Sequence, residues 1–357
     1  MKLGLPPASE SRKDQDIWRR CQLHEADVSI NPPDVTRKSK LFRRLTTGLG
    51  GLAVVLLALA GYSEWLSAQA ARRYPPRGSL SDAVGAQLHY RDVAPSHTPK
   101  GTVVLVHGAW SGHADLLAAL GPHLREYRVI AIDRPGQGWS KRPGGWEMAD
   151  PRRQAEAVMV LLDRIAPERL VVVAHSLAGP LSTHIALERP ERLDGLVLLS
   201  AVTHPWLGSA ARYHGLSTSS VVGPIFNRVI GIPVTSLLLQ KGAHLAFAPQ
   251  VLAPGYAATG ELPLIFREPA FRSNLQDIVT ADRILRRQVL RYGQLKVPVI
   301  AITGDRDAFL SPVRHSAAMA RAAPQGRLLV LPGVGHMPHH ARPEVVVEAI
   351  EGLLRRS

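Results

Sequence analysis

Cysteine is almost absent from this sequence of 357 residues, because Cys21 is the single one. One cysteine excludes a disulfide within the chain and any metal site built from several thiolates. The fifteen histidines do not form an H-E-x-x-H pattern or a comparable ligand spacing. We therefore expect no metal ion and no other cofactor.

Long blocks of one charge are also missing, although the formal net charge is +14. Residues 1–44 hold ten Lys and Arg against six Asp and Glu, which leaves most of the excess spread over the rest of the chain. No basic stretch is interleaved with aromatic residues in the way that favours binding to nucleic-acid strands. We expect no nucleic-acid partner, and we expect attraction to an anionic membrane surface.

Charged residues are absent from the nineteen residues between Leu45 and Ser63, which are rich in Leu, Val and Ala. As a helix, this stretch would be about 28 Å long, close to the ~30 Å hydrocarbon thickness of a bilayer. A cluster of Lys and Arg within residues 37–44 precedes it, so the positive-inside tendency places the N-terminus in the cytoplasm. The sequence predicts a cytoplasmic polar tail (1–44), a transmembrane signal anchor (45–63) and a linker (64–79). The remainder would lie outside the cytoplasm, on a bacterial inner membrane that the chain crosses once.

Two other interpretations of the apolar stretch stay open. Ala68-Gln69-Ala70 has the A-x-A form of a signal-peptidase site, although it lies about ten residues beyond the apolar run. The stretch could instead be a buried or interfacial helix, but no polar face occurs between Gly48 and Gly61. A retained anchor accounts for the long N-terminal region and for the length of the span.

From about residue 80, short β-branched runs alternate with helical segments, which is typical of a largely parallel sheet wrapped by helices. Unbroken apolar runs such as VVLV and LVVV indicate strands that are covered on both faces. Gly85-Ala86, between the first two runs, predicts a β-hairpin. The eight expected strands are Leu80–Val84, Gln87–Arg91, Thr102–Val106, Val129–Ile132, Leu170–Val173, Leu196–Leu199, Val297–Ile302 and Leu328–Leu331.

This alternation stops between residues 204 and 292, where helical pieces, prolines and glycines replace the strands. The sequence therefore predicts an α/β core made of residues 80–203 and 293–357, with residues 204–292 inserted as a helical lid. An insertion at this point would lie over the carboxyl edge of the sheet, where open α/β sheets bind ligands.

Three polar residues follow three of the expected strands. Ser176 lies in Ala174-His175-Ser176-Leu177-Ala178-Gly179, between a strand and a helical stretch, which is the setting of a nucleophile elbow. Alanines stand where the usual G-x-S-x-G motif has glycines. Asp307 and His336 each follow a later strand, so the three residues occur in the chain order Ser, Asp, His of a known catalytic triad.

On these motifs the chain resembles the α/β-hydrolase fold superfamily, in the lid-bearing branch of esterases, carbon–carbon bond hydrolases and cofactor-free haloperoxidase-like enzymes. The resemblance covers about residues 80–356. It also includes His107-Gly108 after the third strand, the Asp133–Ser140 segment after the fourth, and Gly335-His336-Met337-Pro338. It implies a serine hydrolase with an eight-stranded, mostly parallel sheet.

The resemblance implies a role for each member of the triad. Ser176 would be the nucleophile and His336 the general base that accepts its proton. In the family pattern the acid stands three residues after a glycine, which makes Asp307 the partner of the imidazole; Asp305 is the fallback. Haloalkane dehalogenases and epoxide hydrolases need a carboxylate at the nucleophile position, so a serine disfavours them.

Backbone N–H groups of Leu177 and Ala109 are the expected oxyanion hole. Four further residues are candidates for the substrate pocket: Trp110, His175, His204 and Trp206. We interpret His107 as a structural residue of its turn, and His339 and His340 as supporting or surface residues.

We therefore expect hydrolysis of a small apolar carboxylic ester or a related acyl compound. Two alternatives stay open. One is a carbon–carbon bond hydrolase or haloperoxidase-like enzyme of the same fold, and the other is a non-catalytic ligand-binding protein that keeps the fold.

Overall fold

The computed structural model describes residues 35–166, 168–206 and 215–355. The predicted tail up to residue 34, including Cys21, and the lid residues 207–214 lie outside the described residues. The chain divides into two compact units, Met1–Val55 and Leu56–Ser357. All the described strands and helices belong to the second unit, apart from the first part of helix α2 (Val35–Arg73).

Helix α2 runs without interruption from Val35 to Arg73, so it extends beyond both ends of the uncharged stretch. Its residues Phe42–Arg73 are long and apolar enough to cross a membrane, and they form a candidate membrane span. The lid segment Gly223–Phe247 passes the same test of length and composition. The predicted linker is helical as far as Arg73.

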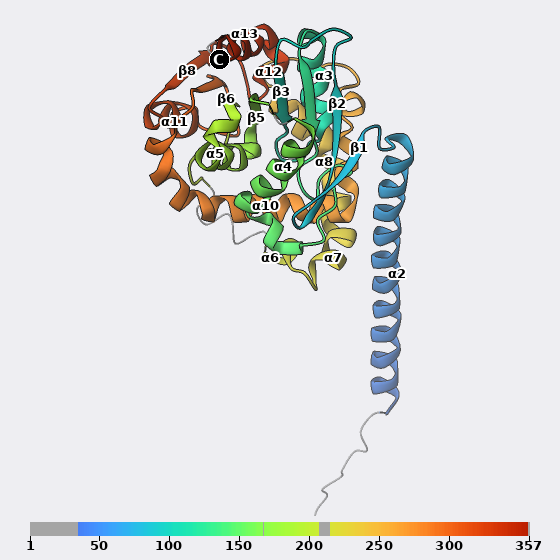
Figure 1. The fold of residues 1–357 in the computed structure, drawn as a ribbon. Helices are drawn as coiled ribbons and strands as arrows, with labels where there is room; N and C mark the ends of the chain where they lie inside the picture. Colours follow the sequence, from blue (N-terminus) through green and yellow to red (C-terminus); the bar gives the residue numbers. More distant parts are fainter. Residues whose placement is uncertain (1–34, 167, 207–214, 356–357) are drawn as a thin grey trace, which may run out of the picture. The chain divides into compact units, whose positions relative to one another are not determined.

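In the part of the chain that the structure describes, eight strands form one sheet in the order β1-β2-β4-β3-β5-β6-β7-β8 (Figure 1). Strand β2 is antiparallel to β1 and β4, and every other neighbouring pair is parallel. The predicted fold class and hairpin are confirmed. The strands are β1 (Ser79–Ala83), β2 (Ala86–Val93), β3 (Thr102–Val106), β4 (Arg128–Ile132), β5 (Leu170–His175), β6 (Leu193–Leu199), β7 (Val299–Gly304) and β8 (Gly326–Leu331).

Helices cover both faces of the sheet, which explains the unbroken apolar runs in its central strands. Alternate residues of β3 enter different cores: Val104 and Val106 pack on one face, Val103 and Leu105 on the other. The first core is closed by α4 (Pro151–Ile165), α5 (Gly179–Glu188) and α11 (Ala318–Ala322) (Figure 1). The second is closed by α3 (His113–Leu120) and α13 (Pro343–Leu354).

The segment between β6 and β7 is helical and contains no strand among its described residues. Short helices η1 (Gly121–His123), η2 (Gly145–Ala149), η3 (Ser176–Ala178), η4 (Pro190–Arg192), η9 (Val313–Ala317) and α12 (Pro338–Ala341) lie in the other connections. The helices of the inserted segment are α6 (Gly215–Thr218), α7 (Gly223–Phe226), η6 (Asn227–Gly231), α8 (Ile232–Phe247), α9 (Tyr256–Thr259), η7 (Leu262–Phe266), α10 (Glu268–Gln288) and η8 (Val289–Gln294).

Candidate active site

Ser176 occupies the sharp turn between β5 and α5. Its φ of +48° is a conformation that residues other than glycine seldom adopt. Close backbone contacts enforce the turn: a Cβ on Gly179 would lie 2.1 Å from the carbonyl oxygen of Val202, and one on Gly108 would lie 2.9 Å from the Ser176 Cβ. The position that requires glycine is therefore Gly179. Ala178 has room for its methyl group, which explains the departure from G-x-S-x-G.

The side chains of Ser176, His336 and Asp307 meet at the carboxyl edge of the sheet. The His336 Nε2 lies 3.0 Å from the Ser176 Oγ, and its Nδ1 lies 2.8 Å from Asp307 Oδ2. His336 is 7% exposed, so water reaches only its edge. The alternative acid Asp305 instead accepts a hydrogen bond from the backbone N–H of Gly333, at 2.7 Å.

The Asp307 carboxylate is held in its ionised form by its hydrogen bonds. Burial by itself would raise its pKa, but hydrogen bonds from His336 and from the backbone N–H groups of Leu310 and Phe309 lower the pKa below its ordinary value. The two backbone bonds are 2.9 and 2.8 Å long. A carboxylate fixed in this way keeps the Nδ1 of His336 as the donor and leaves Nε2 free to accept a proton from Ser176.

The backbone of His336 is fixed from two directions. Its N–H donates to the carbonyl oxygen of Ala246 in the lid, at 3.1 Å. Its carbonyl oxygen accepts from the Nε2 of His175, at 3.1 Å. Burial lowers the pKa of His175 well below its ordinary value, so the ring is neutral. His175 thus lies beneath His336 rather than at the surface.

The loop that carries Ala109 is held by a lid residue. The N–H of Trp110, next to Ala109, donates to the Asn274 Oδ1 on α10, at 3.0 Å. The amide nitrogen of Asn274 donates in turn to Gln137, at 2.8 Å. Trp110 has a φ of +56°, so this loop is also strained. Sequence reasoning missed Asn274, because nothing in a helical lid segment marks one amide as the partner of a distant loop.

A buried ion-pair network supports the same loop from below. Arg134 donates to the carbonyl oxygen of His107 at 3.1 Å and to Asp277 on α10 at 2.8 Å. Arg142 also donates to Asp277, at 2.5 Å. His107 accepts from the backbone N–H of Arg134 at 3.1 Å, and burial followed by the charge of Arg134 lowers its pKa to about 3. The network joins α10 to the turns after β3 and β4.

The geometry of the turn, the triad and the supporting loop agrees with a family comparison. The sequence model of the alpha/beta hydrolase family matches residues 103–349, which is more than half of the chain. This chain belongs to the alpha/beta hydrolase family.

Individual proteins that are similar to this chain share less than a third of its residues. A pimeloyl-[acyl-carrier protein] methyl ester esterase from Edwardsiella ictaluri is 28% identical over 70% of this chain and 92% of its own length. The solved structure of an enol-lactonase from Burkholderia xenovorans has a TM-score of 0.63 at 18% identity, covering 78% of this chain and all of the other. A bacterial membrane phospholipase A has a TM-score of 0.60 at 19% identity, covering 89% of this chain and all of the other.

The remaining pocket candidates of this hydrolase lie on two sides of the triad. Trp110 packs its ring edge-on against Phe271 of α10, with centroids 5.2 Å apart. Trp206 packs with Leu285 and Leu310 and therefore lies on the Asp307 side. His204 contacts Tyr292 and His315, and burial lowers its pKa.

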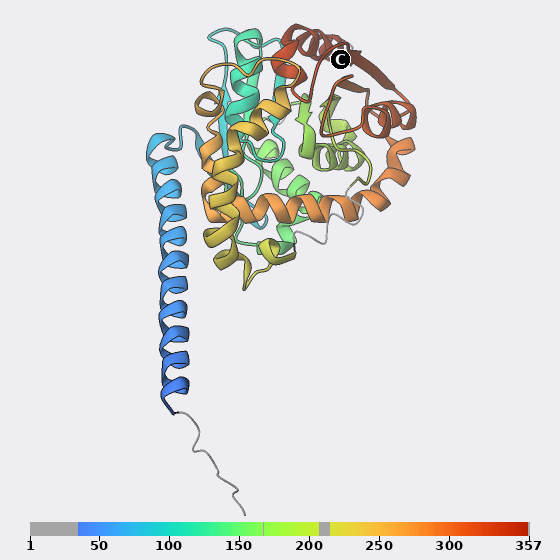
Figure 2. The ribbon, with the colours of Figure 1, turned by 180° about the vertical axis from the view of Figure 1, so that it is seen from behind.

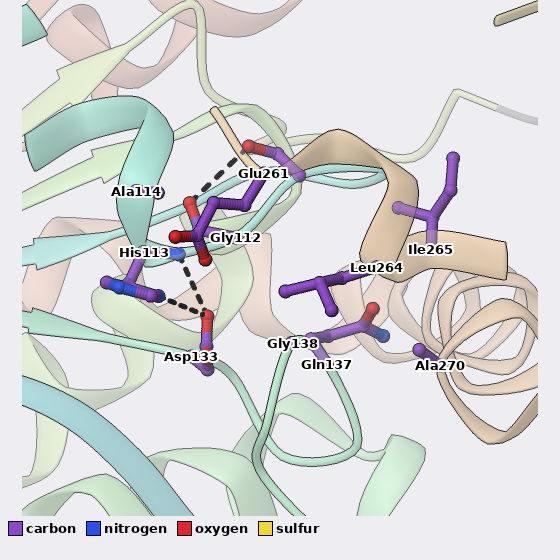
Figure 3. A pocket seen from close by; sticks show the side chains of 11 residues that line it. Gly112, His113, Ala114, Asp133, Gln137, Gly138, Glu261, Leu264, Ile265 and Ala270 are labelled. Carbon is purple, nitrogen blue, oxygen red and sulfur yellow. Dashed lines mark hydrogen bonds and ion pairs between the residues drawn. The ribbon is translucent and has the colours of Figure 1, made fainter. Parts of the chain in front are cut away.

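Two buried His and Asp groups in the described residues have ligand atoms close enough to hold a metal ion: His89, His113 and Asp133; and Asp115, His175 and His339. The carboxylate of Asp133 already accepts hydrogen bonds from both of its histidines and from the backbone N–H groups of His113 and Trp139. Figure 3 shows the two that come from His113. These donors occupy its lone pairs. The Asp133 carboxylate therefore has its partners within the cluster, while the Nε2 of His89 has no hydrogen-bond partner among the described residues.

The second group ties the lid to the core. The Oδ1 of Asp115 accepts a hydrogen bond from the hydroxyl of Tyr256 in the lid, at 3.0 Å. The Nε2 of His340 lies 2.7 Å from the same oxygen. Burial would raise the pKa of Asp115, but the ring of His339, whose Nε2 lies 3.6 Å away, and the closer ring of His340 lower it well below its usual range. His339 and His340 are thus supporting residues of α12, and neither hydrogen-bonds to Ser176 or Asp307 in the described structure.

A small enclosed cavity lies between the lid and the core, beside the Asp133 cluster. Figure 3 shows Glu261 and Leu264 of the lid facing His113 and Gln137 of the core. Its volume of about 10 Å³ is enough for about one water molecule. It is lined by neither Ser176 nor His336.

Proposed function

We propose that this hydrolase cleaves a carboxylic ester or a related acyl bond through a Ser176–His336–Asp307 triad. The observation that carries the proposal is the continuous chain of contacts from Ser176 Oγ through the imidazole to Asp307, at 3.0 and 2.8 Å. Both distances are within the range required of a nucleophile, a base and its orienting acid.

In the proposed reaction, His336 Nε2 accepts the proton of Ser176 as the oxygen attacks the acyl carbonyl carbon. The N–H groups of Leu177 and Ala109 stabilise the negative charge that develops on the carbonyl oxygen. His336 then returns the proton to the departing alcohol, which leaves an acyl-enzyme. Water, deprotonated by the same imidazole, releases the acid and restores Ser176, while Asp307 stabilises each imidazolium.

Relatives with esters as substrates support this class of bond. The Edwardsiella relative is named as a methyl ester esterase, and the two solved neighbours are named as an enol-lactonase and a phospholipase A. Apolar residues of the lid, including Trp206 and Phe247, favour an apolar acyl or alcohol group.

We also propose that α2 anchors this hydrolase as a single span in a bacterial inner membrane, with the catalytic domain outside the cytoplasm. The length and apolar character of Phe42–Arg73 and the cations of residues 37–44 support this topology. A C-terminal alkaline phosphatase fusion should be active in cells, and a C-terminal green fluorescent protein fusion, exported unfolded, should be dark. The opposite pattern would refute the orientation.

The catalytic proposal is tested on the full chain in detergent, by labelling with a fluorophosphonate and by turnover of p-nitrophenyl esters. Ser176→Ala should abolish labelling and lower turnover by about 10⁶-fold. Ser182→Ala is the matched control, because Ser182 is buried on α5 and its hydroxyl has no hydrogen-bond partner among the described residues; it should retain both activities. Equal turnover by wild type and Ser176→Ala would refute the assignment, and an unreactive wild type would favour a non-catalytic ligand-binding protein.

A further inference from the structure

The lid exposes a stripe of apolar side chains along one side of a long helix. Helices α7, η6 and α8 follow one another without a break from Gly223 to Phe247. From Val222 to Leu237 exposed apolar residues recur every three to five positions, and Leu245 follows two turns after Leu238, which places them on one side. Leu237 is the most exposed of them, at 80%. The stripe consists of Val222, Ile225, Ile230, Val234, Leu237, Leu238 and Leu245.

The C-terminal end of α2 packs beside this helix (Figure 2). The Ser63 hydroxyl donates to the carbonyl oxygen of Arg228, at 2.6 Å, and the Arg228 guanidinium donates to Glu64, at 2.5 Å. Leu66 packs against the cluster that contains Ile232. The lid helix is therefore attached to the residues that directly follow the uncharged stretch of α2.

Aromatic residues mark the same level of α2. Tyr62 and Trp65 stack on one another with ring centroids 5.9 Å apart, and both are exposed. Tyr and Trp are enriched where a membrane span meets the headgroups. The Tyr62 hydroxyl lies 3.4 Å from the hydroxyl of Ser236, in the middle of the apolar stripe. The stripe therefore lies at the level at which α2 would leave the bilayer.

We propose that the apolar stripe of the lid docks on the bilayer that holds α2, with its side chains at the boundary of headgroups and acyl chains. The inference rests on the membrane anchoring proposed above. Anchoring makes the contact intramolecular, so that a stripe of modest area is sufficient. Lys241, on the exposed side of α8, would face the headgroup phosphates.

A surface helix fits the observations better than a second span. Ile232, Ala243 and Phe247 on the other side of α8 are buried against the protein. A span would have to remove these side chains from the core, whereas docking leaves them in place. The stripe has one apolar side and one protein-facing side, as an interfacial helix requires.

Docking would connect the bilayer with the catalytic histidine. Ten residues, or about 15 Å of helix, separate Ser236 from Ala246, whose carbonyl oxygen accepts the N–H of His336. Gln250, just beyond α8, accepts the N–H of Gly335, at 3.0 Å. The substrate class that fits this arrangement is an acyl ester whose chain is held in the bilayer.

Depth-dependent quenching tests the docking directly. The full chain, with Cys21→Ser and one introduced cysteine carrying an environment-sensitive fluorophore, is placed in vesicles of phosphatidylethanolamine and phosphatidylglycerol. Lipids spin-labelled near the headgroup or near the acyl-chain end act as quenchers. Leu237→Cys reports on the stripe, and Leu290→Cys is the matched control, because both leucines are 80% exposed. Leu57→Cys reports on the span.

We expect shallow quenching at position 237, deep quenching at 57 and none at 290. Docking would be overturned if quenching at position 237 were no stronger than at position 290. It would also be overturned if the deep label quenched position 237 more than the shallow label, because that result would indicate a second span. Absence of quenching at 57 would remove the anchoring on which the inference rests. Quenching is measured without enzymatic turnover. A protein that hydrolyses no ester would therefore refute the catalytic proposal, and the docking of the stripe could still be measured.

A kinetic comparison tests the consequence for substrates. Leu237→Asp should raise the KM for a long-chain ester in the same vesicles about tenfold. It should leave kcat/KM for a soluble short-chain ester unchanged, and Leu290→Asp should change neither. Equal KM values for Leu237→Asp and wild type on the vesicle substrate would count against docking.

Discussion

At the scale of single residues, the turn at Ser176 stores strain that its neighbours hold in place. A left-handed conformation at a residue other than glycine costs about 1–3 kcal/mol and persists only where the surroundings leave no alternative. Here the surroundings are Gly108 and Gly179, each with backbone or side-chain atoms where a Cβ would lie. The strain directs the Ser176 hydroxyl towards His336 instead of into the helix.

Two neighbouring carboxylates allow a matched test of the acid. Asp307→Asn should lower kcat by about 10⁴-fold, because the amide can no longer fix the tautomer and stabilise the imidazolium of His336. Asp305→Asn should change kcat little, because Asp305 contacts the backbone of Gly333. Steady-state kinetics with a p-nitrophenyl ester measure both. A larger loss from Asp305→Asn would reverse the assignment.

The sequence predicts that the three residues of the proposed triad lie close together. Physical reasoning from the sequence alone does not decide whether Asp305 or Asp307 is the acid. Residues that follow the carboxyl ends of parallel strands must meet at one edge of the sheet, which is why Ser176, Asp307 and His336 are predictable as a group. Whether Asp305 or Asp307 turns towards the imidazole depends on the loop conformation after β7. The family pattern supplied that choice, and the structure places Asp307 next to His336.

At the scale of elements, α10 reaches across the sheet edge and holds the loop that carries Ala109. Asn274→Ala should lower kcat at least about tenfold with little change in KM, because the Trp110 N–H loses its acceptor and the loop shifts. Gln288→Ala is the matched control, because Gln288 is a buried amide at the other end of the same helix that donates to Pro180 and Thr183 of α5. It should lower the unfolding temperature and leave kcat unchanged. Equal kcat losses in both variants would mean that α10 acts only through stability.

The strands were more predictable than the lid for a physical reason. Central strands bury both faces, so their sequences become continuous β-branched runs with clear limits, such as Thr102–Val106, which is found with the same bounds. The lid helices bury one side against a curved surface, and their contacts depend on partners far away in sequence. Asn274 with Trp110, and Arg134 with Asp277, are such pairs.

At the scale of the whole molecule, buried neutral histidines make stability depend on pH. The pKa of His107 is about 3 in the folded protein, against an ordinary value near 6.5, which the unfolded chain should show. Between these values the unfolded chain binds the extra proton. The stabilisation is therefore complete above about pH 6.5 and falls towards pH 3, by about 1.4 kcal/mol per pH unit for one histidine.

His107→Gln should reduce the slope of the unfolding free energy against pH by about 1.4 kcal/mol per pH unit between pH 6.5 and 4. The glutamine oxygen can accept the Arg134 N–H in place of the ring nitrogen. His97→Asn is the control, because the His97 side chain is 50% exposed, and it should leave the slope unchanged. Denaturant titrations of the full chain in detergent at several pH values measure the slope. An unchanged slope in His107→Gln would show that the ring is charged in the folded protein.

The packing of Leu66 against the cluster that contains Ile232 has a practical consequence for the production of shortened forms of this protein. A fragment starting at residue 75 would lack Ser63, Glu64 and Leu66, so the apolar cluster would lose the cover of Leu66 and Arg228 would lose two partners. Such fragments tend to aggregate or to bury the exposed apolar side chains against a second molecule. Recombinant forms of this protein should therefore retain helix α2 and be kept in solution with a detergent.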